Sequence, residues 1–318
     1  MAKKTVFVQA LNSRNLDAGS NPDKNHGIRK SQCARAHWPA QAMMDREAML
    51  DDRQFAMLLG FLNYSWDGYR KVRKGVKKRV IRHMQELGCR NMDHYLARLE
   101  ADPGLRAECR RQLTVSISRF FRDLRLWEIL EAYVLPELAA QQPEPVKVWS
   151  AGCAGGEEVY SFRILWETFT AKYSTPPRLK MIATDLAPQY LERAKKGIYL
   201  SGALRDADAE RRSDWFFNVK KDRYIVRPWV KNGIDWRVQD LLTDPPPAED
   251  LDLVFLRNSL LTYYMPDLSA KPLQRVINAL RPGGFLVIGA KEQLPETARN
   301  HLMPYDRYVF RKTAGREY

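Results

Sequence analysis

Cysteine and histidine are scarce in this 318-residue chain, and neither is arranged as metal ligands usually are. The five histidines form no HExxH cluster, and the four cysteines form no CxxC pair. We therefore expect no metal site. The scattered cysteines fit a reducing, cytoplasmic setting best. They are Cys33, Cys89, Cys109 and Cys153.

Long apolar runs are also missing from the chain. No stretch approaches the ~18 apolar residues that a membrane-spanning helix needs, so we expect a soluble protein with no direct membrane insertion. No long apolar stretch follows the initial Met-Ala-Lys-Lys, which argues against a secretory signal. Residues 1–44 have little hydrophobic periodicity. They are predicted to be a disordered leader, or to reflect a start codon assigned too far upstream.

Positive charge is in clear excess, with 52 basic against 38 acidic residues, a net charge of +14 and a pI of about 9.6. Such a balance favours an acidic partner, although a merely solvated basic surface is the alternative. Much of the charge gathers in residues 69–83, around an apolar stripe. The chain lacks the interleaved aromatic and basic residues of single-strand binders, so we expect no nucleic-acid partner.

Residues 45–140 are predicted to be entirely helical, because apolar residues recur there at spacings of three and four. The clearest stripes are Phe55, Leu58, Leu59 and Leu62 and, after Ser65, Tyr69, Val72, Val76, Val80 and Met84. Further helices are expected at 93–101, 104–115 and 123–140. We assign residues 45–122 to a small all-α domain.

The pattern changes after residue 145, where short apolar strands alternate with helices. Such alternation predicts an α/β fold with a mostly parallel sheet, and we assign it to residues 123–318. The expected strands are 146–150, 179–184, 251–256, 284–289 and 307–311. An insertion at about 199–237 breaks the alternation and holds a charged helix and two short strands, 224–227 and 235–238.

The chemistry is expected where the first strand meets a glycine-rich loop, because ligands of such sheets sit at the carboxyl ends of the strands. Gly152 and its neighbours allow close approach of a ligand to the backbone, and Asp185 ends the next strand, where a carboxylate accepts hydrogen bonds from ribose. The loop lacks GxGxxG, and two acids, Glu157 and Glu158, open the following helix. Acids disfavour a pyrophosphate there. They suit a cationic nucleoside such as S-adenosylmethionine.

The sequence resembles the CheR-type chemoreceptor glutamate methyltransferases, because several motifs occur in the family's order between residues 45 and 292. They are Ser118–Asp123 (SRFFRD), Val148–Ser161 (VWSAGCAGGEEVYS), Ile182–Asp185 (IATD), Ala194–Tyr199 (AKKGIY), Asp240–Leu242 (DLL), Phe255–Asn258 (FLRN), Leu280–Phe285 (LRPGGF) and Gly289–Glu292. The resemblance implies a Rossmann-like class I methyltransferase domain with a small inserted β-subdomain, preceded by a small all-α domain.

The resemblance also implies which residues form the site. Together with Gly152, the cofactor-binding residues expected by motif position are Ser116, Ser118, Arg122, Glu158, Asp185, Asp240, Leu241, Arg257 and Asn258. Three departures from the family pattern stand out. Ser116 and Ser118 replace its Asn and Thr, Leu256 replaces its Cys, and Thr262 falls on its Tyr. A one-residue insertion would return that role to Tyr263.

By the same resemblance, the chain is expected to transfer the methyl group of S-adenosylmethionine to glutamate side chains of a helical receptor, leaving S-adenosylhomocysteine. Arg122 would orient the acceptor carboxylate, and Tyr263 or Thr262 would line the methyl-transfer site. The basic helix at 69–83 would dock the acidic receptor, and a monomer is expected. The alternatives are a related methyltransferase with another acceptor, or a module that binds S-adenosylmethionine without catalysis.

Overall fold

The computed structural model describes residues 50–140 and 145–314, all of which belong to one compact unit, Asp45–Tyr318. The leader predicted at 1–44 lies outside the described residues. Within the described ranges, no helix is both long enough and apolar enough to cross a bilayer.

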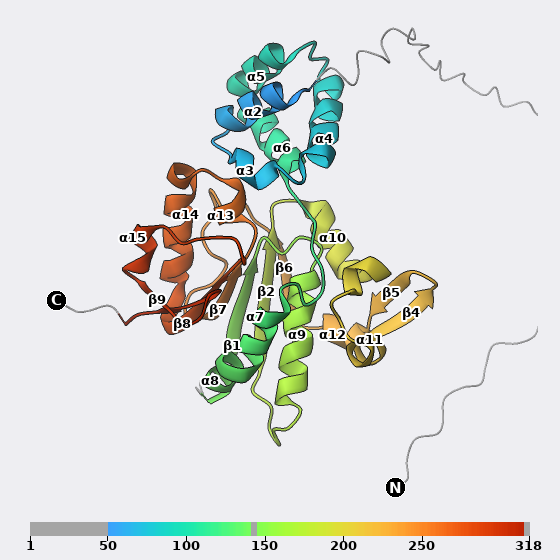
Figure 1. The fold of residues 1–318 in the computed structure, drawn as a ribbon, viewed down its shortest axis with the longest axis vertical. Coiled ribbons are helices and arrows are strands. Elements are labelled where there is room, and N and C mark those ends of the chain that lie inside the picture. Colours follow the sequence, from blue (N-terminus) through green and yellow to red (C-terminus); the bar gives the residue numbers. More distant parts are fainter. Residues whose placement is uncertain (1–49, 141–144, 315–318) are drawn as a thin grey trace, which may run out of the picture. The chain divides into compact units, whose positions relative to one another are not determined.

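The first described part is helical, as expected (Figure 1), and its buried residues form a core of their own. Its helices are α2 (Asp52–Phe61), α3 (Trp66–Tyr69), α4 (Arg73–Glu86), α5 (Met92–Ala101) and α6 (Pro103–Leu113). The single helix expected after Ser65 is instead two, α3 and α4. Both contribute to one core, because Tyr69 of α3 and Val80 of α4 are buried in the same cluster. The two helices are separated by residues 70–72, shortly after Gly68, where a Cβ would collide with the carbonyl oxygen of Thr262.

The prediction of helix throughout 45–140 is wrong for residues 114–122, which are extended or turn. Two buried aromatic residues explain the change, because Phe120 and Phe121 leave the helical part and join the core of the α/β part. Helix resumes in three directly consecutive segments. These are α7 (Leu124–Ile129), the π-helical η1 (Leu130–Val134) and α8 (Leu135–Ala140).

The α/β part contains a seven-stranded sheet in the order β6-β2-β1-β7-β8-β10-β9. Its strands are β1 (Val146–Ala151), β2 (Leu179–Asp185), β6 (Ile234–Val238), β7 (Leu251–Leu256), β8 (Leu280–Ile288), β9 (Leu302–Pro304) and β10 (Val309–Lys312). The pairs among β6, β2, β1, β7 and β8 are parallel, whereas β10 pairs antiparallel with β8 and β9. From β1 the chain adds β2 and then β6 on one side, and it then crosses to the other side to add β7 and β8. Such sheets bind ligands at this switch point between β1 and β7.

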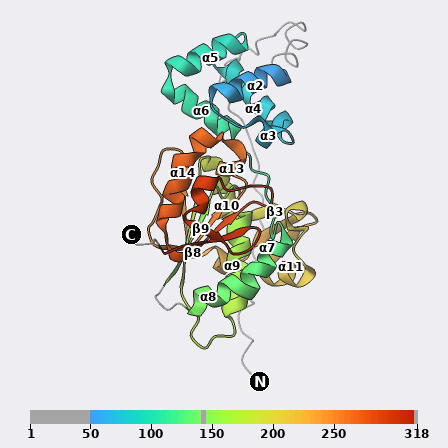
Figure 2. The same cartoon turned by 60° about the vertical axis from the view of Figure 1, so that its left-hand side comes forward.

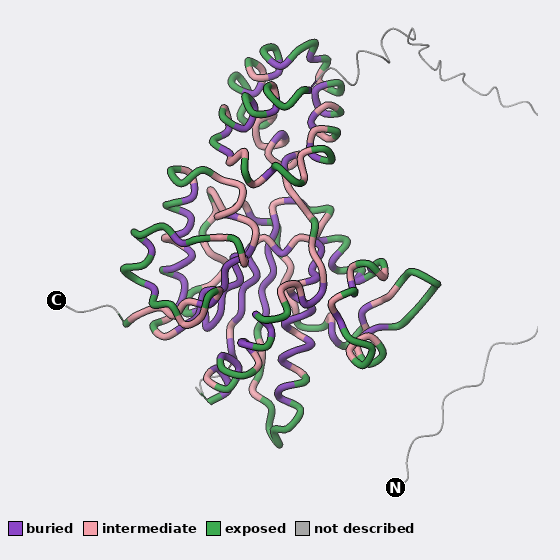
Figure 3. Tube along the Cα trace, in the orientation of Figure 1, coloured by how far each residue is buried: buried purple, intermediate pink, exposed green. Residues whose placement is uncertain are grey.

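Helices cover both faces of this sheet (Figures 1 and 2). One core contains buried residues of α7, η1, α8, α9 (Glu157–Thr170) and α10 (Pro188–Lys196), and the other contains buried residues of α14 (Pro266–Ala279). The central strand β7 is buried along its whole length, so its side chains supply both cores (Figure 3). These layers confirm the Rossmann-like α/β class.

The inserted subdomain is smaller than predicted. It contains η2 (Ser201–Leu204), α11 (Ala209–Trp215) and a separate antiparallel sheet in the order β3-β5-β4. Its strands are β3 (Ile198–Leu200), β4 (Phe216–Lys220) and β5 (Arg223–Val226). The strand expected at 235–238 does not belong to it. That strand is β6, which pairs with β2 from Met181↔Ile234 to Asp185↔Val238 and so extends the main sheet.

Candidate functional site

The loop after β1 lies at the switch point, and its glycines are required by geometry. Gly152 has φ +83°, and a Cβ there would lie 2.8 Å from the Cβ of Ser259. The backbone N–H groups of Gly152 and Cys153 both donate to the carbonyl of Thr184, each at 2.9 Å. The loop is therefore anchored to β2 while its own backbone faces the segment after β7.

Asp185 ends β2 beside this loop. Its Oδ2 accepts from the Ala154 N–H and its Oδ1 from the Ala187 N–H, both at 2.9 Å. Burial raises the pKa of Asp185, and these backbone N–H donors oppose that rise. Each carboxylate oxygen keeps a second lone pair, so the side chain can still accept from hydroxyl groups of a ligand.

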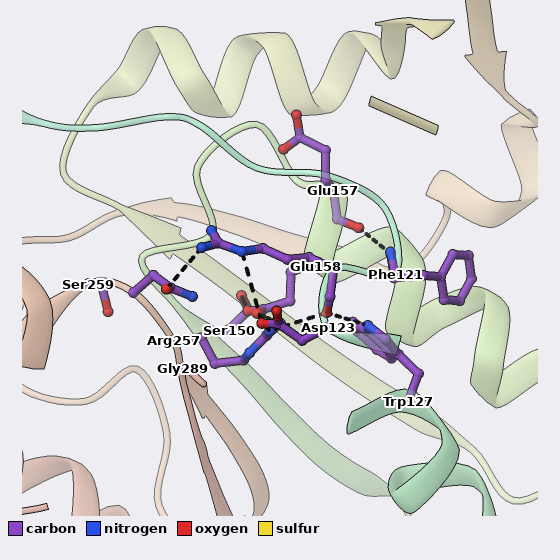
Figure 4. Close-up of polar contacts among 12 residues, drawn as sticks. Phe121, Asp123, Trp127, Ser150, Glu157, Glu158, Arg257, Ser259 and Gly289 are labelled. Atoms are coloured by element: carbon purple, nitrogen blue, oxygen red, sulfur yellow. Dashed lines mark hydrogen bonds and ion pairs between the residues drawn. The ribbon is translucent and has the colours of Figure 1, made fainter. Parts of the chain in front are cut away.

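The two acids that open α9 have different roles, which corrects the expectation that both suit a cationic ligand. Glu158 Oε1 accepts from Ser150 Oγ at 2.8 Å, and its Oε2 pairs with Arg257 at 3.0 Å. Glu157 points away from this cluster (Figure 4) and pairs with Arg193 at 2.5 Å. Burial raises the pKa of Glu157. Only Glu158 therefore faces the site.

Arg257 is the centre of a buried charge cluster (Figure 4). Its side chain is 3% exposed, and it pairs with Asp123 at 2.6 Å as well as with Glu158. It also donates to the carbonyl of Arg122 at 3.2 Å. The turn that carries Arg122 and Asp123 is thereby fixed against β7, although Asp123 has a left-handed φ of +63°. Sequence reasoning missed Asp123, despite its place in the SRFFRD motif.

The segment after β7 is held by a glutamate from the loop after β8. Glu292 Oε2 accepts from the N–H groups of Asn258 at 3.0 Å and Gly289 at 2.6 Å, and its Oε1 accepts from Thr262 Oγ1 at 2.5 Å. Burial raises the pKa of Glu292, and these donors oppose the rise. The Thr262 hydroxyl is therefore engaged, whereas the neighbouring Tyr263 side chain lines the site.

Two adjoining cavities open around these groups, and Gly152, Asn258 and Tyr263 line both. The first is also lined by Asp185, Gln239, Asp240 and Leu241, and by Tyr64, Tyr69 and Arg110 from the helical part. The second is also lined by Ser118, Arg122, Glu158, Arg257, Thr262 and Lys71. The structure thus brings together every predicted site residue except Ser116. Ser116 lines neither cavity, although Val115, Ile117 and Ser118 beside it line the second.

The helical part contributes to the lining of the first cavity, which local sequence patterns did not reveal. The Ser65 N–H donates to the Tyr263 carbonyl at 2.9 Å, and the Met265 N–H donates to the Asn63 carbonyl at 3.0 Å. Arg110 of α6 pairs with Asp240. These contacts join residues about 130–200 positions apart in the chain, so only the folded structure brings them together.

A parallel sheet with a glycine loop, an Asp at the end of β2 and a helix-start carboxylate in place of a phosphate site defines the class of S-adenosylmethionine-dependent methyltransferases. The model of the family described as "CheR methyltransferase, SAM binding domain" matches residues 116–309. The chain belongs to this CheR family, which confirms the resemblance, and its cofactor is S-adenosylmethionine.

Three relatives illustrate the match. A chemotaxis protein methyltransferase of Listeria innocua is 31% identical over 240 residues, which cover 75% of this chain and 88% of the relative. One of Vibrio anguillarum is 34% identical over 57% of this chain and 66% of its own length. An uncharacterized 104.1 kDa protein of Rhodobacter capsulatus is 33% identical over 69% of this chain, which spans only 23% of that protein.

Proposed function

We propose that this methyltransferase esterifies glutamate side chains of an acidic, helical receptor-type protein. Its relatives that are named chemotaxis protein methyltransferases support this acceptor class. The observation that carries the proposal is a row of exposed cations that begins at the second cavity. Lys71 lines that cavity, and Lys74, Lys78 and Arg82 follow it at spacings of three and four.

The other basic residues of α4 are engaged within the protein. Lys77 and Arg73 pair with Asp52, at 2.5 Å and 3.1 Å, and Arg79 donates to backbone carbonyls of Gln112 and Thr114. Lys71, Lys74, Lys78 and Arg82 have no such partner among the residues that the structure describes. A row of cations at helical spacing matches acids repeated every three or four residues on a partner helix.

The cofactor is proposed to lie across both cavities, held mainly by residues 123–318, while residues 45–122 serve as the docking domain and also line both cavities. Asp185 would accept from the ribose hydroxyls, with Asp240 and Leu241 beside the base. Glu158 and Arg257 would face the amino-acid end, with Ser118 and Arg122 covering it. The site fits a phosphate-free cationic ligand because the helix-start acid Glu158 would repel a phosphate.

The acceptor glutamate is ionised at neutral pH, so its methylation needs no general base. S-adenosylmethionine supplies an electrophilic methyl group. Arg122 is proposed to orient the acceptor carboxylate, because it lines the second cavity and its Nη2 donates to Asn258 Oδ1 at 3.2 Å. Tyr263 is proposed as the aromatic wall beside the reacting atoms, in preference to Thr262. Such positioning can contribute ~7–11 kcal/mol.

The cofactor assignment is tested by calorimetric titration of the full chain with S-adenosylmethionine and S-adenosylhomocysteine. We expect saturable binding that Asp185→Ala weakens by about 100-fold or more, because it removes an acceptor of two ribose hydroxyls. Unchanged binding in the variant would contradict the proposed role of Asp185. Circular dichroism controls for folding, because the variant also leaves the Ala154 and Ala187 N–H groups without their acceptor.

The acceptor assignment needs a chemical signature. Incubation with methyl-labelled cofactor and an acidic helical receptor fragment should yield base-labile label that is released as volatile methanol, as glutamyl esters require. Lys74→Glu with Lys78→Glu should raise KM for the acceptor about tenfold without changing cofactor affinity. Lys172→Glu with Lys180→Glu is the matched control, because these exposed lysines line neither cavity. Base-stable label would instead indicate another acceptor group.

A further inference from the structure

Three buried polar atoms around the first cavity form no hydrogen bond of normal geometry with any residue that the structure describes. They are Oε1 of Gln239, the hydroxyl of Tyr64 and Nε of Arg110, and all three residues line this cavity. The residues Tyr64 and Gln239 are only 4% and 6% exposed. Buried polar atoms are normally paired, so unpartnered ones that share a cavity indicate a ligand that supplies the missing partners.

The identity of these atoms specifies the ligand's edge. The Gln239 amide is oriented, because its Nε2 donates to the Pro245 carbonyl at 2.6 Å and leaves Oε1 as a free acceptor. Arg110 Nε is a donor only, and the Tyr64 hydroxyl can donate. The cavity therefore offers one acceptor and two donors. Adenine presents the complement, since its 6-amino group donates and its ring nitrogens accept.

Asp240, the expected neighbour of the base, is less suited to this task. Its Oδ2 is paired with Arg110, and its Oδ1 accepts from the Leu242 N–H at 3.0 Å. The same ion pair fixes the Arg110 guanidinium and thereby aims Nε. Asp240 thus acts as a positioning residue for Arg110, and the free acceptor is that of Gln239.

We infer that Gln239, with Arg110 and Tyr64 from the helical part, recognises the adenine base and excludes its 6-oxo analogue hypoxanthine. This inference rests on the proposed placement of the cofactor in the first cavity. In hypoxanthine the 6-oxygen would face the Gln239 acceptor, and the protonated ring nitrogen would face a donor. Both contacts are repulsive, and sites built around hydrogen bonds reject such analogues strongly. The helical part would therefore contribute directly to the choice of cofactor.

The test compares S-adenosylhomocysteine with its deaminated form, S-inosylhomocysteine, by calorimetry on the full chain. The unaltered protein should bind the deaminated form about 10- to 100-fold more weakly. Gln239→Met should weaken S-adenosylhomocysteine about tenfold and leave the inosyl form nearly unchanged, so that the preference shrinks. Tyr64→Phe should weaken S-adenosylhomocysteine binding about 3- to 10-fold, because it removes a hydroxyl that forms no hydrogen bond of normal geometry within the described part of the chain. Circular dichroism controls for folding, because this hydroxyl lies beside Arg110 and Tyr264.

Gln293→Met is the matched control, because Gln293 is exposed and lines neither cofactor cavity. Equal affinity of the unaltered protein for both ligands would overturn the inference while leaving the cofactor assignment intact. An unchanged preference in both Gln239→Met and Tyr64→Phe would overturn it equally. Failure to bind either ligand would overturn the proposed cofactor placement, and this inference with it.

Discussion

Two loops meet at the switch point of the sheet, and they are held in place by different means. The loop after β1 is shaped by its own backbone, with Gly152 at φ +83° and Gly156 at φ +86°. The segment after β7 is held by side chains from elsewhere, with Glu292 accepting from Asn258 and Thr262. The first loop thus takes its shape from left-handed glycines and from backbone N–H groups bound to Thr184 and Asp185, whereas the second is held by the side chain of Glu292.

This difference assigns the two halves of the site separate tasks. A loop fixed by glycine geometry and by Asp185 provides a rigid cofactor cradle. The segment with Thr262 and Tyr263 also touches the helical part, because the Tyr263 carbonyl accepts from the Ser65 N–H at 2.9 Å. Substitutions in the loop after β1 should therefore alter cofactor binding, and substitutions in the segment after β7 should alter turnover.

The largest loss of stability is expected from Arg257, which follows β7 and pairs with Glu158 at the start of α9. Arg257→Met removes the buried cation that pairs with Glu158 and Asp123, and breaking a buried pair costs about 3–5 kcal/mol of unfolding free energy. Urea denaturation measures this loss. Arg125→Met is the control, because its pair with Glu128 is 70% and 65% exposed and should contribute less than about 1 kcal/mol. Equal losses would show that the Arg257 cluster is not an effective buried pair.

A smaller effect separates the two adjacent acids of α9. Glu158→Gln removes the negative charge beside the proposed cofactor and should weaken S-adenosylmethionine binding about tenfold. The loss should be smaller for S-adenosylhomocysteine, which lacks the sulfonium charge. Glu157→Gln should change either affinity less than about twofold, because that side chain pairs with Arg193 outside the cavities. Calorimetry on both variants checks the contrast, and equal losses would contradict it.

The difference between local signals and tertiary contacts also explains which features of the fold could be predicted from the sequence. Strand periodicity, the glycines and Asp185 are local signals, so the sheet and the cofactor cradle were predictable. The position of β6 was not, because residues 234–238 are as short as the subdomain strands and only pairing with β2 distinguishes them. The break at 114–122 was missed for a similar reason, since Phe120 and Phe121 join a core formed by distant residues.

The site residues that escaped prediction share this property. Arg110 and Tyr64 reach the cofactor cavity only through contacts between the helical and α/β parts. Gln239 carries no motif, and its free acceptor is identified only by the hydrogen bond that its amide donates to Pro245. Glu292 lay inside a matched motif, yet its role depends on three donors from two segments. Local patterns located the cradle, and tertiary contacts determine the rest.

A substitution of Thr262 tests only the segment after β7, which the side chain of Glu292 holds in place. Thr262→Val keeps the shape of the residue but removes the donor to Glu292, so the loop should lose order beside the methyl-transfer site. We expect kcat to fall about 3- to 10-fold with unchanged S-adenosylhomocysteine affinity. Thr262→Ser should restore turnover, because it returns the hydroxyl. A loss of cofactor affinity instead would show that the two loops do not act separately.

The smallest effect is expected from the hydroxyl of Tyr263. Burial raises the pKa of Tyr263 to about 12, so its phenol stays neutral throughout the physiological range. Stability due to the neutral phenol is fully present below pH ~10 and is lost only as pH rises toward the folded value. Tyr263→Phe should therefore lower kcat less than about threefold and leave the pH–rate profile from pH 7 to 9 unchanged in shape. Formation of S-adenosylhomocysteine measures both, and a rate step near pH 8 that disappears in the variant would mean that Tyr263 ionises during turnover.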